Sequence, residues 1–132
     1  MPALDRCHPQ VVRALEKAGW NVAPKPYRLP LVGRPPLSID IEAKNANNRI
    51  IIVEVKCFTD NEVNDLYTAV GQYLVYRSLL RAQNINHSLY LAIPLPIYQG
   101  VFKEIGIFVM QETGIKLIVV DIENEVIVQW LT

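Results

Sequence analysis

The feature that most constrains the fold is a pair of apolar segments on either side of a short polar turn. Ser38–Ala43 and Arg49–Phe58 are rich in Ile and Val, and the polar stretch Asn45–Asn48 lies between them. β-Branched residues favour strands, and clustered asparagines favour a tight turn. The pattern predicts a β-hairpin. Within its second strand, the continuous apolar run Ile50–Val55 makes a polar side chain costly unless that side chain has a partner or a task.

The turn also predicts which residues of the two strands face each other. With the turn centred on Asn47, Asp40 lies directly opposite Glu54. Side chains alternate along a strand, so Lys56 shares the face of Glu54, whereas the valines on either side of Glu54 point the other way, towards a helix layer. The hairpin therefore predicts two carboxylates and a lysine on one face of the sheet.

This arrangement suits a divalent cation. Carboxylates directly opposite each other repel, and a cation bound between their oxygens removes the repulsion. A lysine beside such a site can orient or help deprotonate a metal-bound water and stabilise the charge that develops on a phosphate, as phosphodiester hydrolysis requires. A Glu-x-Lys triplet on a strand is also compatible with an ordinary solvated ion pair, and the chain holds a second one, Glu42-Ala43-Lys44.

The remaining segments predict one mixed α/β domain over residues 1–132. Five prolines make Trp20–Pro36 extended, with room only for edge pairing, and Thr59 to Glu62 has the spacing of a capping box. Two tight-turn residues, Glu123 and Asn124, separate the last two strands. The expected helices are Asp5–Lys17, Thr59 to about Gln83, and Tyr98–Glu112 capped by Gly114; the further strands are Ser88–Ile93, Lys116–Ile122 and Glu125–Leu131.

Length and composition limit the class of protein. The chain has 132 residues, 51% of them hydrophobic, but no apolar run long enough to span a bilayer and no apolar signal segment after Met1. We therefore expect a protein that is not inserted in a membrane and is cytoplasmic. Cys7 and Cys57 are far apart in the sequence and too few for a disulfide framework, so we expect two reduced thiols, with Cys57 packed and inert.

Charge is balanced overall but uneven along the chain. Residues 1–58 carry nine Lys and Arg against five Asp and Glu, and residues 59–132 carry four against eight. A basic half can attract a polyanion, although surface charge distributed by chance gives the same asymmetry. With a pI near 6.7, a version that acts on DNA needs a homodimer or a partner to assemble a basic groove.

Several motifs resemble a known family. The motifs Ile39-Asp40 and Glu54-Val55-Lys56 look like the PD-(D/E)XK restriction-endonuclease-like superfamily, with Ile where the superfamily's name has Pro. So does the following helix, with Gly71-Gln72-Tyr73 and Tyr76-Arg77. More narrowly, the chain resembles the XisH family, named for a factor that controls excision of the fdxN DNA element in cyanobacteria. The segments that carry this resemblance are Ala14–Trp20, Val53–Phe58, Glu62–Leu66 and Ala69–Tyr73.

The resemblance implies a three-layer α/β/α fold with a mixed central sheet. It implies Asp40 and Glu54 as ligands of Mg²⁺ or Mn²⁺ and Lys56 as the catalytic lysine. It implies Gln72 as a residue that helps line the site, although a solvated helix glutamine fits the sequence equally well. Glu16 could join the metal environment or be an exposed helix glutamate. The function implied is a metal-dependent endonuclease acting on DNA in element excision. The alternative is a non-catalytic module that recruits a recombinase or a companion protein of the XisI type.

Overall fold

The computed structural model describes residues 6–59 and 61–132. Its central feature is a six-stranded sheet with the order β1-β4-β5-β6-β7-β8, next to a separate hairpin of β2 and β3. The helical elements are α1 (His8–Lys17), α2 (Glu62–Ala82), α3 (Leu95–Ile97), the π-helical η1 (Tyr98–Gly106) and α4 (Ile107–Thr113). The strands are β1 (Asn21–Val22), β2 (Tyr27–Leu31), β3 (Arg34–Ile39), β4 (Ile41–Lys44), β5 (Ile50–Val55), β6 (Ser88–Pro94), β7 (Leu117–Asp121) and β8 (Val126–Leu131).

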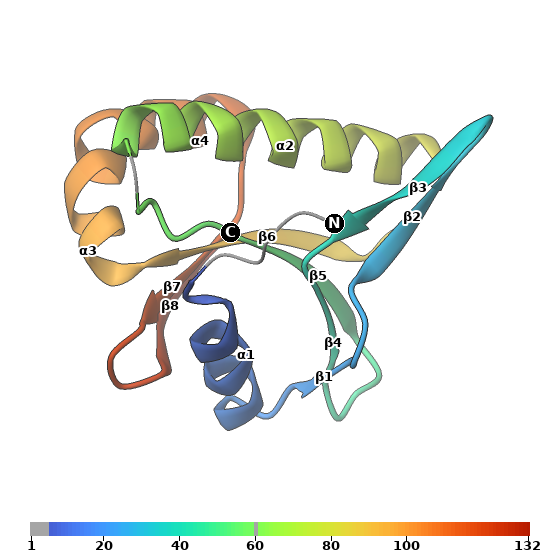
Figure 1. Cartoon of the computed structure of the whole chain (residues 1–132), viewed down its shortest axis with the longest axis horizontal. Helices are drawn as coiled ribbons and strands as arrows, with labels where there is room; N and C mark the ends of the chain where they lie inside the picture. Colours follow the sequence, from blue (N-terminus) through green and yellow to red (C-terminus); the bar gives the residue numbers. More distant parts are fainter. Residues whose placement is uncertain (1–5, 60) are drawn as a thin grey trace.

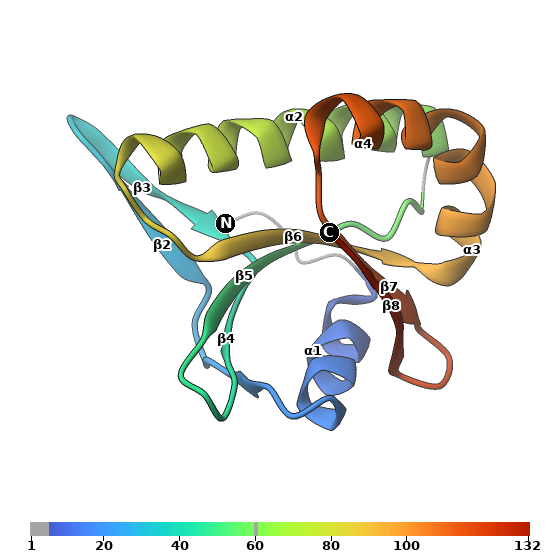
Figure 2. The same ribbon diagram turned by 180° about the vertical axis from the view of Figure 1, so that it is seen from behind.

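The sheet is mixed and covered on both faces. Strands β5, β6 and β7 are parallel, whereas β4 and β8 pair antiparallel to their neighbours. Figures 1 and 2 show α1 against one face, and α2 with α4 against the other. Because side chains alternate along the buried strands, the core forms two clusters, one on each face of the sheet. Ile52 and Leu91 pack on the α2 side, and Val53 and Ala92 pack on the α1 side. The predicted three-layer α/β/α arrangement is confirmed.

The predicted hairpin is present with the predicted register. Ile41 pairs with Val53 and Lys44 with Ile50, as a turn centred on Asn47 requires. The expectation of one continuous strand over Ser38–Ala43 is wrong, because the chain bends at Asp40. Residues before the bend belong to β3, which leaves the sheet to pair with β2 in the hairpin that projects from the body in Figure 1. The bend therefore places Asp40 where the two sheets meet.

Helix α2 begins later than its sequence predicts. Its N-cap is Asn61, whose side-chain Oδ1 accepts a hydrogen bond from the backbone N–H of Asn64 at 3.0 Å, so the capping box starting at Thr59 is wrong. Phe58 decides this, since it is 6% exposed and packs edge-on against Phe102 with ring centroids 5.6 Å apart. Burying this ring uses a left-handed backbone conformation (φ 58°), which ends the extended chain before the helix starts.

The segment predicted as one helix over Tyr98–Glu112 is divided. It begins earlier, with α3 at Leu95, and then winds as η1, which is kinked at Gly100, before α4. A side chain at Gly106 would lie 2.7 Å from the Phe102 ring, so this close packing requires glycine. Gly114 caps α4 in the left-handed conformation (φ 70°), as predicted. Within the described chain, no helix has both the length and the apolar character to cross a bilayer.

The two cysteines form a disulfide, so the expectation of two reduced thiols is wrong. Cys7 is the N-cap residue of α1, and Cys57 follows Lys56 just beyond β5. Their Cα atoms lie 5.9 Å apart although 50 positions separate them in the sequence. Packing of α1 on the sheet brings the two residues together, which their spacing alone could not reveal. The disulfide fixes the start of α1 to the strand end that carries Lys56.

Candidate metal site

The structure brings the two predicted carboxylates together at the bend. The Oδ2 atom of Asp40 accepts a hydrogen bond from the backbone N–H of Val55 at 2.8 Å. In return, the Oε1 atom of Glu54 accepts from the backbone N–H of Asp40 at 3.3 Å. Side-chain oxygens thus take hydrogen bonds that carbonyl groups make in a regular ladder. These bonds hold each carboxylate against the opposite strand.

Glu54 also lies near the helix layer. It is 6% exposed and is the charged residue with the deepest burial in the described chain. Tyr76, on α2, lies close enough to its carboxylate for the two groups to interact electrostatically. Burial raises the pKa of Tyr76 to about 12, and the negative charges of Glu54 and Asp40 add to this rise. Tyr76 therefore remains protonated at neutral pH.

Lys56 follows Glu54 by two residues in the sequence. Its backbone N–H donates to the carbonyl of Ala92 at 3.0 Å, so pairing with β6 continues one residue past the end of β5. Alternation along this extended stretch places Lys56 on the face of Glu54. The side chain is partly buried, and its amine has no hydrogen bond or ion pair with the described residues.

Gln72 and Tyr76 share one face of α2. Residues four apart on a helix lie one above the other, so Gln72 is one turn from the tyrosine near Glu54. Gln72 is partly buried, and no hydrogen bond of its side chain occurs within the described residues. From the sequence, Tyr76 belonged to the motif that carries the resemblance but was given no role in the site. Its spacing from Gln72 is the signal that places it near the carboxylates.

A cavity of about 880 Å³ opens beside Asp40, between α1 and the segment that leads into the hairpin. Glu16 of α1 lines it together with Asp40, which places this exposed glutamate on the wall of the cavity. Lys25 and Arg28 line the same cavity and carry two of the positive charges of the basic half of the chain. Of the predicted site residues, Asp40 and Glu16 lie on the wall of this cavity, whereas Glu54, Lys56 and Gln72 do not line it.

The donor set fits a hard divalent cation that keeps most of its water. Asp40 and Glu54 supply carboxylate oxygens, the ligands that Mg²⁺ and Mn²⁺ prefer, and each hydrogen-bonded oxygen retains a second lone pair. No group of three or more His, Cys, Asp or Glu side chains able to hold a metal occurs in the part of the chain that the structure describes. The pair thus suits Mg²⁺, which is often bound by one or two carboxylates, rather than a fully protein-ligated ion.

Comparisons with known proteins identify the family. The family model described as XisH protein matches residues 1–128. The chain belongs to the XisH family. It is similar to a crystal structure of an XisH family protein from Nostoc punctiforme PCC 73102, with 34% identity, 97% of this chain and 100% of that chain covered, and a TM-score of 0.87.

A second solved structure shows the same fold. It is described as an fdxN element excision controlling factor protein from Anabaena variabilis, with 34% identity, 98% of this chain and 100% of that chain covered, and a TM-score of 0.88. None of the curated proteins compared with the chain matches it. The XisH fold therefore extends over nearly the whole chain, including the strands and the helix that hold Asp40, Glu54 and Tyr76.

Proposed function

We propose that this XisH protein is a divalent-metal-dependent phosphodiester hydrolase that acts on DNA in element excision. The observation that carries the proposal is the carboxylate pair Asp40 and Glu54, with Lys56 two residues after Glu54, just past the end of β5. Two observations support it: the described role of the similar Anabaena variabilis protein as an excision controlling factor, and the resemblance of the motifs to PD-(D/E)XK endonucleases.

Each residue has a role that follows from its position. Asp40 and Glu54 would hold Mg²⁺ or Mn²⁺, which supplies Lewis-acid chemistry and a water of lowered pKa. The amine of Lys56 stabilises negative charge on the phosphate and helps orient the attacking water. Tyr76 would orient the Glu54 carboxylate from α2, and Gln72 would contact the substrate or a water from the same helix face.

The cavity next to Asp40 supports a polyanionic substrate. Lys25 and Arg28 on its wall attract a phosphate backbone, and their charges matter most at low ionic strength. Because the chain has no net charge, strong DNA binding needs a second copy or a partner to extend this basic surface. Replacing Arg28, Arg34 and Arg49 by Ala is expected to weaken DNA binding and to reduce its salt dependence.

Metal binding tests the proposal without requiring the natural substrate. We would measure thermal unfolding with and without Mg²⁺ or Mn²⁺ for the wild type, Glu54→Gln and Glu42→Gln. Ligand at a hundredfold its Kd stabilises by about 2.7 kcal/mol, a rise in Tm of about 10 °C for 132 residues. Glu42 belongs to the second Glu-x-Lys triplet and is the matched control.

The expected result is a metal-dependent rise in Tm for the wild type and Glu42→Gln that is lost in Glu54→Gln. This result would justify screening DNA substrates for cleavage, with Lys56→Met as the inactive variant that still binds metal. No rise in the wild type, or an equal rise in Glu54→Gln, would overturn the proposal.

A second candidate function is a non-catalytic interaction module. Exposed apolar side chains in the outer helix layer favour it: Tyr67 is 66% exposed, Val75 53% and Phe108 67%. Large apolar groups in one layer are typical of protein interfaces, so a recombinase, a companion protein or a second copy of the chain could bind there. This candidate predicts that Tyr67→Glu with Phe108→Glu abolishes partner binding while metal binding is unchanged.

A further inference from the structure

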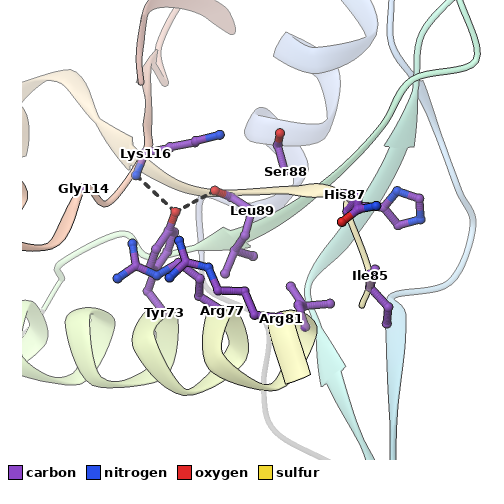
Figure 3. Close-up of a pocket in the computed structure, with 11 residues that line it drawn as sticks. Tyr73, Arg77, Arg81, Ile85, His87, Ser88, Leu89, Gly114 and Lys116 are labelled. Carbon is purple, nitrogen blue, oxygen red and sulfur yellow. Dashed lines mark hydrogen bonds between the residues drawn. The ribbon is translucent and has the colours of Figure 1, made fainter. Parts of the chain in front are cut away.

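A second pocket, of about 230 Å³, lies on another side of α2 and belongs to neither the carboxylate pair nor its cavity. It is formed by the second half of α2, the loop into β6 and the loop that follows α4 (Figure 3). The residues that line it are Tyr73, Arg77, Leu80, Arg81, Ile85, Asn86, His87, Ser88, Leu89, Gly114 and Lys116. No carboxylate is among them, so the pocket has a net positive charge.

Two arginines from α2 give the pocket its chemistry. Arg77 and Arg81 are four residues apart, so they project from the same side of the helix, and Figure 3 shows both guanidinium groups beside the Tyr73 ring. The His87 ring and the Lys116 side chain point away from them in the same view. Like charges at this spacing repel, and neither arginine forms an ion pair with a carboxylate of the described residues.

The first of these arginines is already fixed in place. Arg77 donates from Nη1 to the carbonyl of Thr113 at 2.6 Å, and its guanidinium carbon lies 5.6 Å from the centroid of the Tyr73 ring. The Tyr73 hydroxyl is held between the Leu89 carbonyl and the Lys116 N–H, so the ring is a rigid wall. A guanidinium has five N–H donors, and the bond to Thr113 uses one of them. The remaining donors are free to bind a ligand.

Arg81 completes the pair at the edge of the pocket. Its side chain is exposed and has no hydrogen bond with the described residues. It also lies in the last turn of α2, where a cation offsets the partial negative charge of the helix C-terminus. That role accounts for one positive charge but not for a second arginine placed one turn earlier on the same side.

We propose that Arg77 and Arg81 form a binding pocket for a phosphate group. Guanidinium groups bind phosphate in a bidentate way, and two of them match the two charges of a terminal phosphate, whereas a carboxylate would neutralise only one. The cavity is smaller than the 300 to 1,000 Å³ typical of pockets for drug-sized ligands, so it fits the phosphate and not a whole nucleotide. The phosphate is either the free ion or the terminal phosphate of a nucleic acid.

Titration with inorganic phosphate tests this proposal independently of the metal site. Binding is measured by calorimetry in EDTA at constant ionic strength, with acetate as the reference anion, for the wild type, Arg81→Gln and Lys44→Gln. Arg81 is exposed, so its variant is expected to fold, and Lys44 is an exposed cation on β4 outside the pocket. The expected result is phosphate binding that is at least tenfold weaker in Arg81→Gln and unchanged in Lys44→Gln.

Equal phosphate affinity in the wild type and Arg81→Gln, or no preference for phosphate over acetate, would overturn the proposal. A pair of short oligonucleotides, with a 5′-phosphate and with a 5′-hydroxyl, distinguishes the two sources. Binding of the 5′-phosphorylated strand that is tighter than binding of both the 5′-hydroxyl strand and inorganic phosphate identifies a nucleic-acid end. Binding of inorganic phosphate without binding of either strand identifies the free ion. Because EDTA removes divalent cations, failure here is separable from failure of the proposed metal site.

Discussion

The hydroxyl group of Tyr73 makes two hydrogen bonds that join separate elements of the fold. Tyr73 is 1% exposed, and its hydroxyl donates to the carbonyl of Leu89 at 2.7 Å and accepts from the N–H of Lys116 at 3.1 Å. One oxygen thus connects α2 with β6 and with the residue that precedes β7. Tyr73→Phe keeps the ring and removes only these two hydrogen bonds.

The expected cost of Tyr73→Phe follows from what is left unpaired. A buried polar group without a partner costs about 1–3 kcal/mol. Leu89 is 4% exposed, whereas Lys116 is partly buried, so water can replace the lost bond more easily at Lys116. We expect a loss of about 2 kcal/mol. With an unfolding entropy of about 2.1 cal/mol/K per residue over 132 residues, the Tm falls by about 7 °C.

Urea and thermal unfolding measure this loss, with Tyr67→Phe as the control. Tyr67 lies on the same helix and is 66% exposed, so its variant should stay within about 0.5 kcal/mol of the wild type. If Tyr73→Phe were no less stable than Tyr67→Phe, the hydroxyl would not carry the two bonds, and the reasoning would be refuted.

Three further predictions concern other parts of the molecule. The pKa of Tyr76 is about 12 in the folded state and near 10 in the unfolded chain, so the free energy of unfolding falls as pH rises through this range. Tyr76→Phe should therefore show a smaller fall in Tm between pH 10 and pH 12. Reducing the Cys7–Cys57 disulfide should lower the free energy of unfolding by about 2–4 kcal/mol in urea titrations, because 50 positions separate the two residues. Asn61→Ala should lower the free energy of unfolding by about 1 kcal/mol, as measured by thermal unfolding. An equal loss in Thr59→Ala would show instead that Thr59 caps the helix.

The hairpin could be predicted from sequence because its signals are local. Centring the turn on Asn47 was enough to predict the pairs from Ile41 with Val53 to Lys44 with Ile50. The same reasoning placed Glu54 and Asp40 opposite each other, where the structure connects them by a hydrogen bond. It failed to predict the bend at Asp40, because side-chain oxygens interrupt the backbone ladder there and strand propensity contains no information about that exchange.

The contacts that sequence analysis missed all join distant segments. Cys7 meets Cys57 only after α1 has packed on the sheet, and Tyr76 reaches Glu54 only after α2 has packed on the other face. The start of α2 depends on the burial of Phe58 against Phe102, which overrides a well-spaced local cap. In each case tertiary packing decides between local alternatives that the sequence leaves close in energy.

Helix α2 contributes residues to different parts of the molecule from several of its sides, so the number of residues between them cannot change. Tyr76 lies near Glu54 and Asp40, Tyr73, Arg77 and Arg81 line the smaller pocket, and Tyr67 and Val75 are exposed. Each residue advances the helix by about 100°, so a single insertion between positions 67 and 72 would turn the preceding part of the helix relative to everything after it. A deletion within 73–76 would separate Tyr76 from Glu54. We therefore expect this segment to tolerate substitutions on its outer side but neither insertion nor deletion.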